Sequence, residues 1–350
     1  MFLNSFNHFR ALAILSIVMG HTYLYVGMKF DTYPEYVVMN LILGGTSLFV
    51  FISGFLFHHV FYKKYQFNTF LLGKFKNVAI PYLLLGVIPI FLQILYKSDA
   101  FDGYFAPTSD SLWGAYIVPY IKYYWTGRFL IGYWYIPFIL VTFLLSPLHV
   151  KFIRMAPKLQ IALIGMLSVV SVLMHRPEDN LFVFQSVLYF TPIYLVGIFC
   201  SVYKEQVMVF FQNKVLLLFS IVLFFALLEA YEGEVGSYHK APLPNGYLDY
   251  MFIQKTCMCF LLMTIFARLE SWKNRFVEYS ASTSFTIFFL HPLVMTICNA
   301  IAGKYLGLNL YLDSWPVYIV YTVFILLVCI AIAKTVKYLI PNQSRYLIGY

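Results

Sequence analysis

The chain has 350 residues, of which 61% are hydrophobic, 20% are aromatic and only 11% are charged, and its mean hydropathy is +0.76. A soluble domain carries about 25% charged and about 45–50% apolar residues, so this composition argues against a soluble enzyme, a disordered protein or a nucleic-acid-binding protein. The formal net charge is +9, from 24 Lys and Arg against 15 Asp and Glu. We assign this excess to one face of a membrane rather than to a polyanionic partner.

The apolar residues gather in long stretches that predict transmembrane helices. One span needs about 20 mostly apolar residues. The sequence contains ten such stretches, at residues 9–28, 37–59, 78–96, 129–150, 159–175, 182–202, 215–231, 247–269, 282–301 and 315–340. The first stretch is not followed by a small-residue cleavage site, so we expect a retained span and not a removed signal peptide. The expected fold is therefore an all-α integral membrane bundle of about ten transmembrane helices.

The charges between the stretches predict the topology. With the termini inside, the inner segments hold 16 Lys and Arg and 3 acidic residues, while the outer segments hold 8 and 12. The positive-inside rule then favours cytoplasmic termini. The longest loop, 97–128, would be external, and its aromatic segment SLWGAYIVPYIKYYW is too short to span the membrane. We find no linker or repeat, and expect one membrane domain over 1–350 with no appended soluble domain.

The first and ninth stretches each contain a histidine that would lie inside the membrane. Ionisable groups inside a span are costly, so each is a candidate functional residue. Arg10 and His21 are eleven positions apart, or three helical turns plus about 20°, which places both on one face about 16 Å apart. Arg10 would sit at the cytoplasmic mouth, where it could instead anchor to lipid phosphates. His21 would lie inside the membrane, as a reactive group or as a structural imidazole with a polar partner.

His291 lies midway along the ninth stretch, directly before Pro292. It could pair with His21 to handle protons, because imidazole titrates near neutral pH. Alternatively, His291 and Pro292 form only a packed kink. In the second stretch, the Ser53–Gly54 step could let another backbone or a ligand approach closely.

Further charged residues cluster at the two membrane faces. The predicted cytosolic loop after the second stretch carries four lysines, Lys63, Lys64, Lys74 and Lys76. Clustered cations of this kind could bind a phosphate-rich ligand or anionic lipid. The outer half could line an entry for a polar acceptor, through Arg128, Glu229, Asp249 and Lys255. Lys255 could instead pair with Glu229 or Asp249.

Other chemistries lack a sequence signal. The five cysteines lie in apolar stretches without the paired spacing of a zinc site, so no metal site is predicted. We find no Walker loop, dinucleotide fingerprint or G-x-S-x-G elbow.

Taken together, several motifs resemble those of the acyltransferase 3 family of membrane-bound bacterial acyltransferases. FRALAILSIVMGH, with Arg10 and His21, resembles the family's first-span signature, and SLFVFISGFLF is similar to its Ser-Gly motif. GKFKNVAIPYLL resembles the basic motif before the third span. GYWYIPFILVTFLLSP, with Trp134, and FTIFFLHPLV, with His291, are similar to its fourth-span and late-span patterns.

This resemblance implies a function and roles for individual residues. The protein would be an O-acyltransferase of the bacterial plasma membrane that moves an acyl group, usually acetyl, from acyl-CoA to a hydroxyl of a cell-envelope glycan or its lipid-linked precursor. The fourth-span motif is most similar to members that acylate exopolysaccharides of the intercellular-adhesin type. His21 would be the catalytic histidine and Arg10 its signature arginine. Lys74 and Lys76 stand at the arginine-x-arginine positions for the donor, but lysine cannot clamp a phosphate bidentately.

From the resemblance and the residue pattern we assign Arg10 to catalysis and donor binding, and the acceptor to Ser53, Arg128, Trp134, Lys255 and His291. Acyl-CoA is a substrate here, no tightly bound cofactor is expected, and membrane lipid and polysaccharide synthesis or export proteins are candidate partners, whereas nucleic acid is not. His21 could take the hydroxyl proton or carry the acyl group itself. Two rival functions are a proton-coupled glycan transporter or flippase and a non-catalytic scaffold in a polysaccharide synthase.

Overall fold

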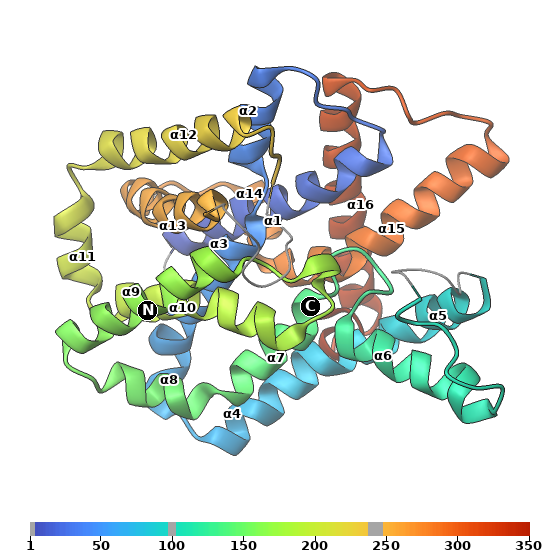
Figure 1. The fold of residues 1–350 in the computed structure, drawn as a ribbon, viewed down its shortest axis with the longest axis horizontal. Helices are drawn as coiled ribbons and strands as arrows, with labels where there is room; N and C mark the ends of the chain where they lie inside the picture. The colour runs from blue at the N-terminus through green and yellow to red at the C-terminus, as the bar shows by residue number, and fades with distance from the viewer. Residues whose placement is uncertain (1–3, 97–102, 237–247) are drawn as a thin grey trace.

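The computed structural model describes residues 4–96, 103–236 and 248–350, which fold into a bundle of helices (Figure 1). The α-helices are α1 (Asn4–Tyr25), α2 (Tyr33–Ile42), α3 (Gly45–Leu56), α4 (Phe67–Lys74), α5 (Ile80–Tyr96), α6 (Val118–Thr126), α7 (Tyr135–Leu144), α8 (Ser146–Ile153), α9 (Pro157–Met174), α10 (Val183–Val202), α11 (Lys204–Phe211), α12 (Val215–Tyr231), α13 (Tyr250–Arg268), α14 (Arg275–Ser282), α15 (Ser284–Tyr305), α16 (Trp315–Leu339) and α17 (Ser344–Ile348). Three π-helical segments are η1 (Phe57–Phe61), η3 (Phe75–Ala79) and η4 (Trp113–Ile117), and two 3-10 turns are η2 (Tyr62–Lys64) and η5 (Glu178–Asn180).

Among the described residues, seven helical segments are long and apolar enough to cross a membrane, or up to nine if each of two bent pairs is one span. The bends lie between α7 and α8, at 57°, and between α11 and α12, at 81°. Helix α1 has 22 residues but is not among the nine, because its polar residues lower its hydropathy. The fold is thus a multi-pass helical membrane protein, while the count of ten remains a prediction.

Hydrogen bonds join segments that the topology places on the same side of the membrane. Asn4 bonds Glu270 near one face, while the Lys29 amide donates to Asp313 and Asn40 bonds Glu234 near the other. The pairing agrees with helices that alternate in direction. Which face is cytoplasmic remains a prediction from the charges.

Besides the bend between α7 and α8 inside the predicted stretch 129–150, two further departures from the predicted stretches are local. The second stretch is divided between α2 and α3 at Leu43–Gly44. The segment expected to be a basic cytosolic loop is largely helical, since α4, η3 and α5 run without interruption from Phe67 to Tyr96. Lys74 and Lys76 therefore lie on a continuous helical segment, because the apolar residues around them pack against neighbouring helices.

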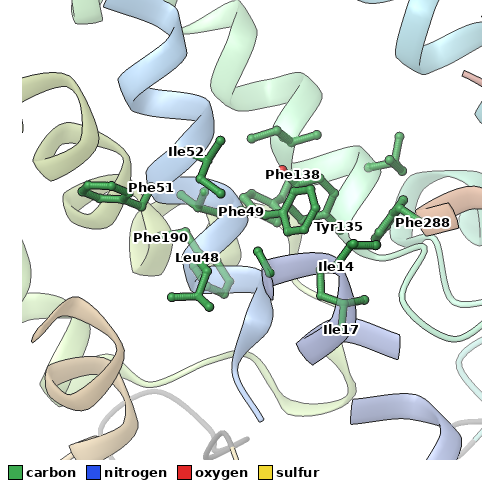
Figure 2. Packing of buried hydrophobic residues seen from close by; sticks show 14 of the residues in the cluster. Ile14, Ile17, Leu48, Phe49, Phe51, Ile52, Tyr135, Phe138, Phe190 and Phe288 are labelled. Carbon is green, nitrogen blue, oxygen red and sulfur yellow. The ribbon is translucent and has the colours of Figure 1, made fainter. Parts of the chain in front are cut away.

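Helix α1 lies near the centre of the bundle, where it packs against α3, α13, α14, α15 and α16 (Figure 1). The apolar core beside it joins residues of α1, α3, α7, α10 and α15, as Figure 2 shows for Ile14, Phe49, Phe138, Phe190 and Phe288. This packing surrounds the polar face of α1 with helices rather than lipid. A central position is what a helix carrying Arg10 and His21 requires.

Helices α3 and α10 make the most extensive contact of the bundle. A Cβ atom on Gly54 would collide with the Tyr194 carbonyl, and one on Gly197 would collide with the Phe51 carbonyl. Small residues let helix backbones approach closely in membranes. The close approach expected at the Ser53–Gly54 step is therefore confirmed, with a backbone as the neighbour.

Candidate active site

The structure brings His21 of α1 and His291 of α15 together. His21 Nδ1 lies 2.8 Å from His291 Nε2, and the two rings are nearly parallel, with 2° between their planes. His291 Nδ1 lies 2.8 Å from the Ile287 carbonyl oxygen, one turn back on α15. His291 is fully buried and His21 is half-buried. The predicted pairing of the two histidines is confirmed as a geometric fact.

These contacts determine which nitrogen carries a proton when both imidazoles are neutral. The Ile287 carbonyl only accepts, so His291 Nδ1 must be the donor. His291 Nε2 is then an acceptor, and His21 Nδ1 must donate to it. The lone pair of His21 therefore lies on Nε2, the nitrogen opposite the hydrogen bond. An imidazole oriented in this way is suited to act as a base or a nucleophile.

The turn between α6 and α7 lies against this pair. Gly132 has φ of 82°, and a Cβ atom on it would lie 2.9 Å from His21 Cε1. The Tyr133 hydroxyl donates a 2.6 Å hydrogen bond to the Phe289 carbonyl of α15. A side chain at position 132 would therefore displace the His21 ring. Gly132 and Tyr133 begin the GYWYIPFILVTFLLSP motif, but their residue types alone indicated no role for them.

Trp134 ends this turn and packs against Arg176, which lies between α9 and α10. The Arg176 guanidinium carbon lies 4.5 Å from the centre of the Trp134 ring, which stacks on Phe138 and Phe190. Arg176 also donates a 2.8 Å hydrogen bond to Asn180 Oδ1. Burial lowers the pKa of Arg176 to about 10, so it remains charged at neutral pH. The charge of Arg176 acts electrostatically on His21.

Sequence reasoning missed Arg176. The sequence offered one signal for it. Arg176 is a basic residue in a short loop on the predicted outer face, where most charged residues are acidic. Arg128, which we did predict, interacts electrostatically with both Asp179 and Arg176. The structure therefore places Arg128 and Trp134 near the same loop, residues 175–182, that supplies Arg176.

Arg10 lies at the other end of the site. Its Nη2 donates a 2.9 Å hydrogen bond to Ser284 Oγ, in the first turn of α15. Helices α1 and α15 are thus joined at two levels, by Arg10 with Ser284 and by His21 with His291. The predicted separation along α1 keeps Arg10 away from the reacting nitrogen of His21.

The predicted donor lysines have different surroundings. The Lys74 ammonium lies over the rings of Phe61 and Phe143, at 4.3 and 4.6 Å from their centres, whereas Lys76 is exposed. Arg345 of α17 interacts electrostatically with Lys74, and α17 packs against η3. A guanidinium from the end of the chain therefore stands beside the position where the family pattern has arginine. No local sequence pattern could have shown this, because the two residues are far apart in the chain.

Two other predicted acceptor residues are held by neighbouring side chains or backbone. Ser53 hydrogen-bonds the side chain of Tyr135. Lys255 is fully buried, and its Nζ donates to the carbonyls of Asn40 and Leu41 at 2.8 and 3.0 Å. These are last-turn carbonyls of α2, which lack partners within their own helix.

Glu229 of α12 is the charged neighbour of Lys255. The two side chains interact electrostatically, and both are fully buried. The contacts of Lys255 match a helix cap. Both carboxylate oxygens of Glu229 are buried without a hydrogen-bond partner among the described residues, so the ion-pair alternative stays a prediction. The predicted contact of Lys255 with an acceptor remains a prediction.

No group of three or more His, Cys, Asp or Glu residues in the described ranges is arranged to hold a metal ion. The polar groups that the structure gathers along α1 are the candidates for chemistry. These are the imidazole pair, the guanidinium of Arg176 and, at the opposite end of α1, the guanidinium of Arg10.

The fold and the site together define a multi-pass helical membrane protein with a hydrogen-bonded imidazole pair inside the bundle. Comparison with known families identifies the kind of protein: the model of the acyltransferase 3 family, described as an acyltransferase domain, matches residues 3–334. The chain therefore belongs to this family of membrane acyltransferases. Comparisons with curated proteins and with solved structures gave no match.

Proposed function

We propose that this membrane acyltransferase moves an acyl group, most simply acetyl, from cytosolic acyl-CoA to a hydroxyl of a cell-surface polysaccharide or its lipid-linked precursor. The proposed location is the bacterial plasma membrane. The observation that carries the proposal is the hydrogen-bonded series from Ile287 through His291 to His21. When both imidazoles are neutral, it leaves His21 Nε2 unprotonated inside the bundle.

The chemistry of ester formation agrees with this arrangement. Acyl transfer from a thioester to a hydroxyl needs a base at the hydroxyl and stabilisation of the charge that develops on the carbonyl oxygen. His21 Nε2 accepts the hydroxyl proton in direct transfer, or attacks the thioester carbon to form an acyl-imidazole. Both routes use the same lone pair. Rapid acid quench of protein labelled with radioactive acetyl-CoA distinguishes them, since only the second leaves label on the protein.

The donor is proposed to enter at the Arg10 end of α1. Arg10 bonds Ser284 in the first turn of α15. The same part of α15 also packs against the C-terminal segment, where Gly349 lies so close to Phe285 and Phe289 that a Cβ atom on it would touch both rings. The same segment carries Arg345, beside Lys74. Several cations from distant parts of the sequence thus face one end of the bundle. Phosphate groups of CoA are the expected ligands, since guanidinium groups bind phosphate bidentately.

Thioester turnover by the purified protein tests the proposal. Full-length protein in lipid nanodiscs is incubated with acetyl-CoA and an envelope-glycan fraction, and free CoA and acylated glycan are measured. We expect turnover for the unchanged protein and a loss of about 10²–10⁴-fold in kcat for His21→Ala, with acetyl-CoA binding retained. Normal turnover in a folded His21→Ala protein would contradict the catalytic assignment.

Arg10 should behave differently from His21. Arg10→Ala is expected mainly to raise KM for acetyl-CoA, and Arg10→Lys to give an intermediate KM, because the charge is kept but the fork is lost. Glycan uptake into proteoliposomes without any acyl-CoA would instead support the transporter. Mass spectrometry of envelope glycans from cells with and without the protein would identify the acyl group.

A further inference from the structure

Arg176 is, with Arg10, one of the two guanidinium groups described above beside α1. No motif in the sequence assigned Arg176 a role. The residue is 8% exposed and lies between α9 and α10. The Trp134 ring covers one face of the guanidinium, and Asn180 accepts one of its N–H bonds. Arg176 is therefore held in one orientation rather than extended into solvent.

The loop that carries Arg176 has an unusual backbone conformation. His175, Asp179 and Asn180 all have positive φ, at 61°, 48° and 55°. Backbone in this region costs free energy for residues other than glycine and persists only where the surroundings enforce it. The His175 side chain lies beside Asp249, with His175 Nδ1 3.9 Å from Asp249 Oδ2. The strained turn aims Asn180 at Arg176.

One donor of Arg176 remains unused. The Nε atom is buried and has no hydrogen-bond partner among the described residues. A buried donor without a partner costs about 1–3 kcal/mol, so such groups call for an explanation. Arg176 also lies within electrostatic range of His21, and Trp134, which covers it, is two residues from Gly132, which touches the His21 ring. The turn 132–134 thus lies against both side chains, with Gly132 at the His21 ring and Trp134 over the Arg176 guanidinium.

We propose that Arg176 is a further catalytic residue, whose free N–H group binds the oxygen of the acyl carbonyl as negative charge develops on it. This inference rests on the proposed acyl transfer. A preformed donor at the position of a developing oxyanion is worth about 10²–10³-fold in kcat. Trp134 and Asn180 are then positioning residues that hold the guanidinium.

The step balances as follows. The acceptor hydroxyl oxygen bonds to the thioester carbon, its proton passes to His21 Nε2, and the carbonyl π electrons move onto the oxygen that Arg176 binds. When the carbonyl re-forms, the carbon–sulfur bond breaks, and the CoA sulfur takes the proton from His21. The products are an ester and CoA thiol. No oxidant, reductant or further reactant is needed.

The test compares Arg176→Gln and Arg176→Lys with the unchanged protein in nanodiscs, using acetyl-CoA and the envelope-glycan fraction. We expect kcat to fall about 10²–10³-fold in Arg176→Gln with KM for acetyl-CoA unchanged, and less in Arg176→Lys, which keeps the charge. Millimolar methylguanidinium should restore part of kcat in Arg176→Gln but not in His21→Ala. The matched control is Arg154→Gln, because Arg154 is an exposed arginine at the end of α8.

Three outcomes would overturn the inference while leaving the proposed function intact. One is a kcat in Arg176→Gln within about threefold of the unchanged protein. Another is a raised KM for the glycan at normal kcat, which would make Arg176 an acceptor-binding residue. If Arg176→Gln does not fold, Arg176→Lys is measured instead. A folded Arg176→Lys protein with full kcat and no response to methylguanidinium would then refute the inference. By contrast, absence of thioester turnover in the unchanged protein would refute the proposed function itself.

Discussion

Replacing His291 with phenylalanine tests the hydrogen-bonded imidazole pair directly. The new ring fills a similar space but offers His21 Nδ1 no acceptor in place of His291 Nε2, which lies 2.8 Å away. A buried N–H left without a partner costs about 1–3 kcal/mol. At 1.36 kcal/mol for each factor of ten, that cost lowers the population of the reactive His21 tautomer about 5- to 150-fold. We expect kcat to fall by this factor, with KM for acetyl-CoA nearly unchanged.

The matched comparison uses His291→Gln and His149→Phe. The Gln carbonyl oxygen can accept from His21 Nδ1, so His291→Gln should keep more activity than His291→Phe. His149 is also buried and packs against Tyr194, but its Nδ1 has no hydrogen-bond partner among the described residues. His149→Phe should therefore leave kcat unchanged. The assay is initial-rate thioester turnover per folded molecule, and equal activity in His291→Phe and the unchanged protein would refute the reasoning.

Three further predictions concern packing and charge. Gly54→Ala should lower the melting temperature, at a cost of about 1–3 kcal/mol, because its Cβ would collide with the Tyr194 carbonyl; Gly165→Ala, which meets nothing within 4 Å, should not, and equal melting of the two would contradict the α3–α10 approach. Lys255→Met should destabilise by about 1–3 kcal/mol, because the Asn40 and Leu41 carbonyls at the end of α2 lose their donor, yet keep kcat per folded molecule; selective loss of turnover would instead return Lys255 to the acceptor site. Lys76→Gln should weaken acetyl-CoA binding and reduce its salt dependence in titration calorimetry, whereas unchanged affinity would support the lipid-anchor interpretation.

Local sequence was sufficient to predict most helices, because a long apolar stretch is stable in a bilayer only as a helix. The predicted stretch at 215–231 coincides with α12, and the one at 315–340 ends one residue after α16. Breaks were harder to predict. The division at Gly44 and the bend between α7 and α8 fall inside stretches whose average hydropathy is that of a single span, although Gly44–Gly45 and Pro147 stand at the two breaks.

The sequence alone also determined which residue types could carry chemistry. Arg10, His21 and His291 stood out because charged or titratable groups are expensive inside a membrane, wherever the chain places them. Only the tertiary structure decided their partners. The contact between His21 and His291 joins α1 to α15. Arg176 is held by Trp134 and Asn180. The Lys255 ammonium donates hydrogen bonds to carbonyls at the end of α2. Such contacts join residues far apart in the chain, so they follow from how the helices pack and not from any local pattern.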